Sequence, residues 1–224
     1  MREQNLTLMH VVSVNVGLPR EVEWKHMRVS TAIFKEPVKE PIPVRKLNLD
    51  GDRQADLTVH GGPDKAVYGY PIEHYDYWRE KLLHMPPGLG AFGENLATRD
   101  VLEENLNIGD QVRVGTALLR VAQPRMPCYK LQVRFDREDM TKLFAMSRRS
   151  GFYFSVIEEG EVKEGNALEI VHRDEHRVSV AQINDLYYTK RIDAELLDRV
   201  LQLPSLTSES RSAILSRVGA LQPR

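Results

Sequence analysis

The sequence predicts an α+β protein. A predominantly β-barrel domain with inserted helices covers residues 1–173, and a small three-helix domain covers residues 174–224. Two observations support this class. From about Met9 to His172 the apolar runs are short, rich in β-branched residues and separated by turn sequences, which is typical of strands. After His172 the apolar residues recur at helical spacing instead.

The expected strands of the first domain follow one another at spacings that suggest a barrel. In chain order they cover residues 9–17, 28–35, 43–49, 117–123, 152–157 and 167–172. Turn sequences separate many of these runs, namely DGD at 50–52, HGGPD at 60–64, IGD at 108–110 and EEG at 158–160. Prolines at 37, 41 and 43 cannot donate to a ladder, so that segment is expected to be an extended connection with an edge strand.

Two helices are expected as insertions between these strands. The first covers residues 71–82, where Pro71 suits an opening turn and the aromatic residues fall on one face. The second covers residues 136–149, where Asp136 can cap the helix and the apolar residues form one stripe. These faces are those of ordinary core helices, so neither helix is assigned any chemistry.

The C-terminal part is predicted to form three short helices, over residues 178–191, 193–203 and 208–221. Ser179 and Gln182 have the spacing of a capping box, and Pro204 is expected to end the second helix. All the unusual polar motifs lie before this tail. We therefore expect it to be an interaction or docking module that is separable from the site of chemistry.

The composition limits the classes of partner and location. The formal net charge is −1, which argues against a protein whose main task is to bind a nucleic acid polymer. The N-terminus lacks the layout of a signal peptide, and no run approaches the ~20 apolar residues of a membrane span. We therefore expect a cytoplasmic protein with no membrane partner. The single cysteine cannot form an intramolecular disulfide, and zinc pairings of the C-x2-C kind are absent.

Four stretches combine polar or glycine residues with apolar ones at unusual density. They are KHMRVSTAIFK at 25–35, LDGDRQADLTVHGGPDKAVYGYP at 49–71, AFGENL at 91–96 and QPRMPCYKL at 123–131. In the second, Gly51, Gly61 and Gly62 allow tight turns and close approach of backbone N–H groups to a ligand. Hydrogen-bonding side chains crowd the same segment: Asp52, Gln54, Asp56, His60, Asp64 and Lys65. Taken alone, it could also be a long hairpin whose charges are solvated.

The AFGENL stretch places Asn95 soon after a glycine and between Phe92 and Leu96. An amide both donates and accepts hydrogen bonds, so at a partly buried turn it would suit the edge of a heterocycle. The alternative is an asparagine that caps the turn.

Cys128 stands out because of its neighbours. A lone cysteine is often a small buried hydrophobe. Pro124 and Pro127, however, indicate a strand end or bulge that turns Cys128 out of the ladder. Arg125 and Lys130 would favour the thiolate, which is the form that binds metals and attacks electrophiles. A cysteine hydrolase would need a histidine base such as His60 with a third group, and nothing local supports it specifically.

Taken together, the motifs HGGPDKA, FGENL and QPR-x-PCYKL, in this order, resemble the MOSC family, and most closely its YiiM-like branch. The resemblance covers most of the chain, including the helical tail. It implies a β-barrel domain that binds the molybdenum cofactor, with Cys128 as a ligand to molybdenum. It further implies two-electron reduction of N-hydroxylated compounds, including purine and pyrimidine base analogues, to amines. In the mitochondrial amidoxime-reducing relatives an arginine directly precedes the cysteine, whereas here Pro127 does so.

The same resemblance suggests roles for the remaining candidates. Asp52, Gln54 and Asn95 are candidates for contacts with the pterin edge of the cofactor. Its phosphate would need fixed cations, for which Arg28, Lys35 and Arg125 are candidates, or backbone N–H groups, such as those of Gly61 and Gly62. Thr31 and His60 are further candidates for binding the cofactor. His60 would supply protons near the metal, which makes it a second catalytic candidate beside Cys128.

Electrons are expected to come from a separate reductase that contains flavin or a similar group. The chain has no G-x-G-x-x-G fingerprint after a strand and no cysteine set for an iron–sulfur cluster. Two other readings stay open: a carrier of sulfur or of the cofactor without turnover, and a redox-silent module that binds another phosphorylated ligand. The sequence also leaves a homodimer open.

Overall fold

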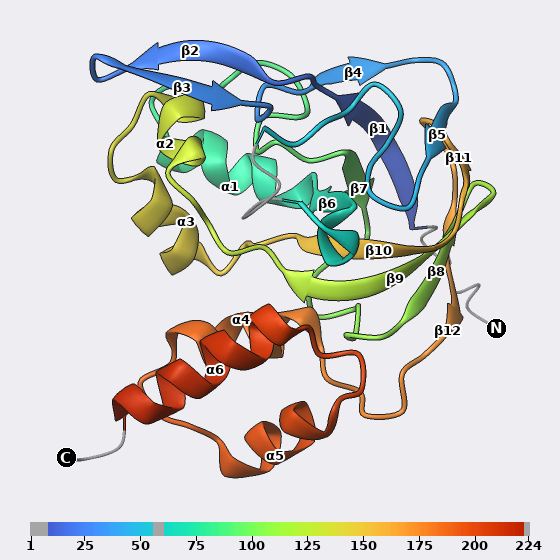
Figure 1. Ribbon diagram of the computed structural model, residues 1–224, viewed down its shortest axis with the longest axis vertical. Coiled ribbons are helices and arrows are strands. Elements are labelled where there is room, and N and C mark those ends of the chain that lie inside the picture. Colours follow the sequence, from blue (N-terminus) through green and yellow to red (C-terminus); the bar gives the residue numbers. More distant parts are fainter. Residues whose placement is uncertain (1–8, 56–60, 222–224) are drawn as a thin grey trace, which may run out of the picture.

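The computed structural model describes residues 9–55 and 61–221 of the chain, and an eight-stranded sheet forms its centre (Figure 1). The order of its strands is β12-β8-β9-β10-β6-β7-β1-β4. Their bounds are β1 His10–Val16, β4 Glu36–Val38, β6 Val67–Pro71, β7 Leu96–Arg99, β8 Gln111–Val114, β9 Ala117–Pro124, β10 Phe152–Glu158 and β12 Leu168–His172. Neighbouring strands are antiparallel except β6 and β7, which are parallel and joined through a helix.

Two small two-stranded sheets accompany the central one. The hairpin of β2 (Arg20–Trp24) and β3 (Met27–Thr31) lies at the top of Figure 1, and β5 (Ile42–Val44) pairs with β11 (Gly160–Val162). The strong alternation of burial along β3 follows from its period of two residues. The proline-rich segment forms the short strands β4 and β5 with a connection between them, as predicted.

The α+β class is confirmed, but the central sheet is open rather than a closed barrel. Its two edges are β12 and β4, and no ladder joins β12 to β1 in the described part of the chain. A single antiparallel bridge between His10 and Ala167 brings these two sides together. Two hydrogen bonds flank it, from the Leu168 N–H to the Met9 carbonyl at 2.8 Å and from the Val11 N–H to the Asn166 carbonyl at 2.9 Å. The regular spacing of strands suggested a barrel, but it did not indicate how far the ladder would continue.

The predicted helices are present with shifted ends. The described residues contain η1 Pro63–Lys65, α1 Glu73–Lys81, α2 Lys130–Phe135, α3 Met140–Ser147, α4 Val180–Tyr188, α5 Ala194–Gln202 and α6 Ser208–Leu221. Pro71 ends β6 instead of opening α1. Asp136 was expected to cap the second inserted helix, but it closes α2 at φ 47°, and the N-cap of α3 is Asp139. The capping box of Ser179 and Gln182 is present at α4.

Two hydrophobic clusters stabilise the fold. The larger fills the sheet and includes apolar residues of all three C-terminal helices, such as Ile183, Val200 and Ile214. The second is aromatic and lies under α1 and α3, where the Trp78 indole N–H donates to the Tyr70 hydroxyl at 2.7 Å. Because the tail shares the larger cluster, the domain boundary near residue 174 stays a prediction. None of the described helices combines the length and apolar character that crossing a membrane would require.

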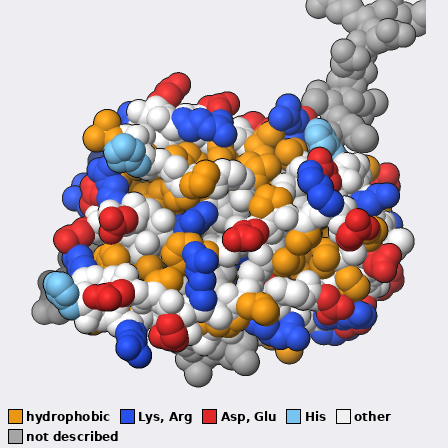
Figure 2. Space-filling view, turned by 90° about the horizontal axis from the view of Figure 1, so that it is seen from above, with side chains coloured by type: hydrophobic (Ala, Val, Ile, Leu, Met, Phe, Trp, Pro, Cys, Tyr) orange, Lys and Arg blue, Asp and Glu red, His pale blue; other side chains and the backbone are white. Residues whose placement is uncertain are grey.

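Charged side chains of both signs are interspersed over the face shown in Figure 2, with hydrophobic side chains exposed between them. This mixture is the surface expected of a chain whose formal net charge is −1.

Gly151 tests the packing between β6 and the connection that precedes β10. Its φ is +63°, and a Cβ there would collide with the Gly69 carbonyl oxygen and the rings of Tyr68 and Tyr70. We predict that Gly151→Ala lowers the free energy of unfolding by about 3 kcal/mol, because overpacking adds to the strain of positive φ. Gly165→Ala is the control, since its φ is +85° with open space around it, and should cost only about 1 kcal/mol. Equal losses in urea denaturation would contradict the predicted collision.

Candidate functional site

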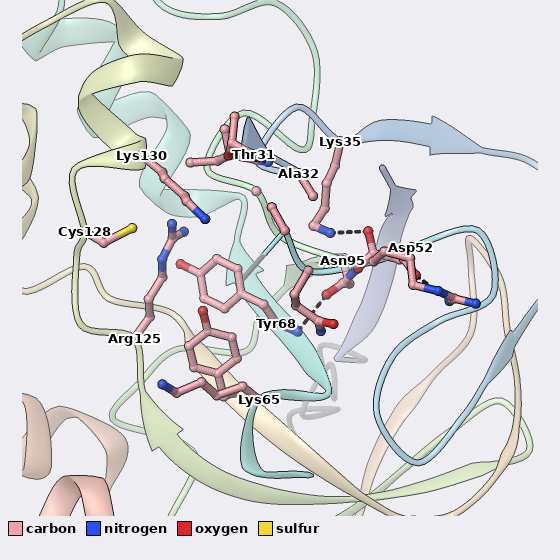
Figure 3. Close-up of a pocket in the computed structure, with 16 residues that line it drawn as sticks. Thr31, Ala32, Lys35, Asp52, Lys65, Tyr68, Asn95, Arg125, Cys128 and Lys130 are labelled. Carbon is pink, nitrogen blue, oxygen red and sulfur yellow. Dashed lines mark hydrogen bonds and ion pairs between the residues drawn. The ribbon is translucent and has the colours of Figure 1, made fainter. Parts of the chain in front are cut away.

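A pocket opens between the end of β3, the loop after β5, the start of β6, the AFGENL turn and the connection from β9 to α2 (Figure 3). The residues that line it are Thr31, Ala32, Ile33, Lys35, Asp52, Arg53, Gln54, Ala55, Lys65, Tyr68, Gly93, Asn95, Arg125, Cys128, Lys130 and Tyr153. Segments more than a hundred residues apart in sequence therefore meet in one cavity.

The pocket brings together most of the residues proposed from the sequence. Seven of them line it: Thr31, Lys35, Asp52, Gln54, Asn95, Arg125 and Cys128. Arg28 lies on the exposed side of β3 and is not among the lining residues. Gly61 and Gly62 line a neighbouring hollow next to η1. His60, and with it the proposed proton donor, lies outside the described residues.

The end of the pocket far from Cys128 is organised by Asp52, which is 1% exposed. Its Oδ1 accepts hydrogen bonds from the Lys35 ammonium and from the Gly17 N–H, the latter at 2.9 Å. Its Oδ2 accepts from the Asn95 amide at 2.9 Å. Burial lowers the pKa of Lys35, and the adjacent carboxylate of Asp52 partly offsets this effect. The carboxylate thus joins three segments and compensates one buried cation.

Asn95 connects β1 to β6 through both its backbone and its side chain. Its backbone N–H donates to the Tyr68 carbonyl at 2.8 Å and its carbonyl accepts from the Asn15 N–H at 2.7 Å. Its side-chain oxygen accepts from the Tyr68 N–H at 3.0 Å, and its amide N–H groups donate to Asp52 and to the Asn15 carbonyl. Both amide protons are therefore directed at protein acceptors. Only acceptor capacity on Oδ1 remains for a ligand.

The turn before Asn95 is held from inside by Glu94, which is fully buried. Its carboxylate accepts hydrogen bonds from the Tyr75 hydroxyl, the Gly90 N–H at 2.7 Å and the Phe92 N–H at 3.1 Å. Burial raises the pKa of Glu94, and these donors counteract the rise. Because the turn is fixed in this way, the Phe92 carbonyl is aimed at the guanidinium of Arg125, which donates to it.

In the part of the chain that the structure describes, Arg125 and Lys130 are buried cations without a carboxylate partner. They are 6% and 7% exposed, and no described carboxylate lies within ion-pair distance of either side chain. The Arg125 guanidinium lies over the Tyr68 ring, 4.7 Å from its centroid, and the Lys130 ammonium points into the pocket (Figure 3). Burial of an uncompensated charge is costly. Such an arrangement is therefore typical of a site that is completed by an anionic ligand.

The balance of charge over the whole pocket also favours an anionic ligand. Five cations line it in the described structure, namely Lys35, Arg53, Lys65, Arg125 and Lys130, against the single carboxylate of Asp52. In an enclosed site this excess attracts anions much more strongly than it would at an exposed surface.

Cys128 lies between β9, which ends at Pro124, and α2, which begins at Lys130. It is outside the sheet, as the prolines predicted. Its carbonyl accepts the Leu131 N–H at 3.0 Å, which anchors the connection at the start of α2. The thiol is half-buried and points into the pocket toward Arg125 and Lys130 (Figure 3). This position allows the sulfur to reach a ligand bound in the cavity.

Two tyrosines line the pocket that the sequence did not single out. Tyr68 lies on β6 and donates its hydroxyl to the Ser150 carbonyl at 2.7 Å, while Tyr153 lies on β10 beside Cys128. Burial raises the pKa of both phenols, so both are protonated at physiological pH. In sequence they look like ordinary strand aromatics, and only the pairing of β10 with β6 and β9 identifies them as pocket residues.

Comparison with known proteins assigns the family. A MOSC domain profile matches residues 56–169, and a profile of the YiiM-like, 3-alpha helix domain matches residues 178–218. YflK of Bacillus subtilis (strain 168) is 39% identical over 213 residues, which are 95% of this chain and 96% of that protein. The chain belongs to the MOSC family, in its YiiM-like branch.

Two further similarities extend this result. The crystal structure of YiiM from Geobacillus stearothermophilus matches the MOSC protein described here with a TM-score of 0.77 at 35% identity, covering 94% of this chain and 99% of that one. A protein from Gibberella moniliformis (strain M3125 / FGSC 7600) named Reductase is 31% identical over 179 residues, or 79% of this chain and 32% of that protein. MOSC domains are associated with molybdenum cofactor binding.

Lys35 and Lys130 provide a contrast between a compensated and an uncompensated buried cation. Lys35→Met leaves Asp52 buried without its cation, and we predict a loss of about 3 kcal/mol in the free energy of unfolding. Lys130→Met removes a charge that has no carboxylate partner, and should leave the stability of the ligand-free protein unchanged or raise it by about 1 kcal/mol. Urea denaturation of both variants measures the difference. A loss of several kcal/mol in Lys130→Met would contradict the assignment of Lys130 as uncompensated.

Proposed function

We propose that this MOSC protein is a molybdenum-cofactor-dependent oxidoreductase that reduces N-hydroxylated compounds to amines, with Cys128 as the protein ligand to molybdenum. The observation that carries the proposal is the position of Cys128 in a pocket with two buried cations, Arg125 and Lys130, that have no carboxylate partner among the described residues. The similarity to a protein named Reductase supports an oxidoreductase as the general class.

The residues present fit such a cofactor. It carries a phosphate and a dithiolene, both anionic, and the pocket has an excess of buried positive charge. Molybdenum bound to a dithiolene accepts a soft thiolate readily, and the cofactor supplies the other soft ligands. Within the described residues, no group of three His, Cys, Asp or Glu side chains could hold a metal ion. A metal bound through Cys128 would accordingly take its remaining ligands from the cofactor or from solvent.

Individual residues would hold the cofactor in different ways. Arg125 and Lys130 would bind its anionic groups by charge-assisted hydrogen bonds. Gln54, which is half-buried in the pocket wall, and the spare acceptor capacity of Asn95 suit the edge of a pterin. Asp52 and Lys35 compensate each other, so we assign them to the wall that orients Asn95. Arg28 is exposed, and Gly61 and Gly62 lie in the adjacent hollow, so their proposed phosphate contacts would require a ligand that extends beyond the pocket.

The reaction consumes two electrons and two protons: R–NHOH + 2 e⁻ + 2 H⁺ gives R–NH₂ + H₂O. When bound, the cofactor supplies a metal centre that can change its oxidation state by two electrons. The chain has to deliver protons and exclude bulk water. Tyr153 is a protonated phenol that lines the pocket together with Cys128, and it can hold a proton near the reacting oxygen. His60 remains the candidate from the sequence for a proton donor near the metal.

Electrons would come from a separate protein. The chain has no dinucleotide fingerprint and one cysteine, so it offers no evident site for a nicotinamide, a flavin or an iron–sulfur cluster. A flavin-containing reductase that docks near the mouth of the pocket would fill this role.

Amine production from an N-hydroxylated purine tests the proposal. With NADH or NADPH as the sole donor, we expect the purified, cofactor-loaded protein to show negligible turnover. Adding a flavin-containing reductase or an artificial low-potential donor should restore it. Cys128→Ser is the blank, because a hydroxyl is a hard ligand that is not deprotonated at neutral pH. Full activity of the serine variant would remove Cys128 from the mechanism, and nicotinamide-driven turnover by the wild-type chain alone would exclude a separate donor.

A further inference from the structure

Cys128 also lines a second cavity, on the side of the C-terminal helices. This α6-side hollow is lined by Lys65, Gln123, Pro124, Met126, Pro127, Cys128, Tyr153 and Glu209. It shares Lys65, Cys128 and Tyr153 with the pocket described above. The cysteine therefore lies where two cavities of different character meet.

The two cavities differ in charge. The first pocket has a clear excess of cations, whereas the α6-side hollow contains one cation, Lys65, and one carboxylate, Glu209, among its described residues. These two form an ion pair, with 2.6 Å between the Lys65 Nζ and the Glu209 Oε2. A neutral pair beside the prolines and Met126 suits a flat, uncharged molecule with a few polar groups better than it suits an anion.

Glu209 is held through one carboxylate oxygen. Both Lys65 and the amide of Gln123, at 3.4 Å, contact its Oε2. No hydrogen bond joins Oε1 to another described residue, and the side chain is 41% exposed. Lys65 and Gln123 thus orient the carboxylate, while its Oε1 stays available as a strong hydrogen-bond acceptor among the described residues.

We propose that the α6-side hollow is the substrate site and that Glu209 binds the substrate by accepting a hydrogen bond from an N–H group of an N-hydroxylated heterocyclic base. This inference rests on the proposed function and extends it to the C-terminal helices. The ring would lie against the apolar wall of Pro127, Met126 and Tyr153, with its N-hydroxyl group toward Cys128. The helical tail then contributes to substrate recognition. The sequence had instead suggested a tail separable from the site, because all the unusual polar motifs lie before it.

A purely structural role for Glu209 would be to dock α6 on the sheet. The structure already contains a separate docking contact: the hydroxyls of Thr207 and Ser210 donate to the Gln123 Oε1 at 2.7 and 3.1 Å. Ser210 is fully buried and does not line the hollow. It therefore offers a matched control that weakens docking and leaves the carboxylate in place.

The experiment measures binding and turnover separately in wild type, Glu209→Gln and Ser210→Ala. Binding is measured by calorimetric titration of the purified protein with adenine, the amine that an N-hydroxylated adenine would yield. We expect Glu209→Gln to raise the Kd for adenine and the KM for the hydroxylated base by about tenfold, because a hydrogen bond to a charged acceptor is lost. The kcat should stay within about twofold, since the remaining machinery is intact. Ser210→Ala should lower Tm and leave Kd and KM unchanged.

The outcomes separate this inference from the proposed function. Loss of adenine affinity in Glu209→Gln supports the substrate site even if wild type shows no turnover, in which case the proposed reduction alone fails. An unchanged Kd and KM in Glu209→Gln, in a wild type that does reduce the substrate, overturns the site and leaves the reduction standing. Equal losses of affinity in both variants would assign Glu209 to docking, and no adenine binding by wild type would also overturn the inference.

Discussion

The buried carboxylate of Asp52 is the interaction on which the candidate site depends. It compensates the Lys35 ammonium, fixes the backbone at Gly17 and orients the amide of Asn95. Asn95 in turn ties β1 to β6 through four further hydrogen bonds of its backbone and side chain. One carboxylate thus holds three segments together, those of Gly17, Lys35 and Asn95. This wall of the pocket is therefore preorganised before a ligand binds.

With that wall internally compensated, the buried positive charge without a described carboxylate partner lies at the other end of the pocket. Arg125 and Lys130 stay without a carboxylate partner among the described residues, and both lie near the half-buried sulfur of Cys128. The cost of burying them is reduced when an anion is bound, so the site couples affinity for the ligand to its own stability. On the α6 side of Cys128, Glu209 forms an ion pair with Lys65, so the two cavities differ in charge.

The sequence predicted which motifs converge, but not how each side chain is used. The neighbouring prolines predicted that Cys128 lies outside the ladder. The motifs predicted that Thr31, Lys35 and Arg125 belong to the same site, and all three line one pocket with Cys128. Arg28 was assigned to the cofactor, yet the alternation along β3 places it on the exposed side.

The use of each side chain depends on long-range strand pairing, which local sequence patterns do not reveal. Whether the amide of Asn95 faces a ligand or other protein groups depends on the distance between β1 and β6, which no local pattern encodes. Local sequence does not place Tyr153 or Glu209 in a cavity either, because Tyr153 resembles any strand aromatic and Glu209 resembles any surface helix residue. It also does not predict that a single bridge takes the place of full barrel closure in the described part of the chain.

The central claim, that Cys128 is the protein ligand to molybdenum, is tested most directly by X-ray absorption fine structure at the molybdenum edge of the cofactor-loaded protein. The account predicts one sulfur neighbour more than the dithiolene supplies, replaced by oxygen in Cys128→Ser. A sulfur shell that the dithiolene alone explains, and that is the same in both proteins, would contradict it.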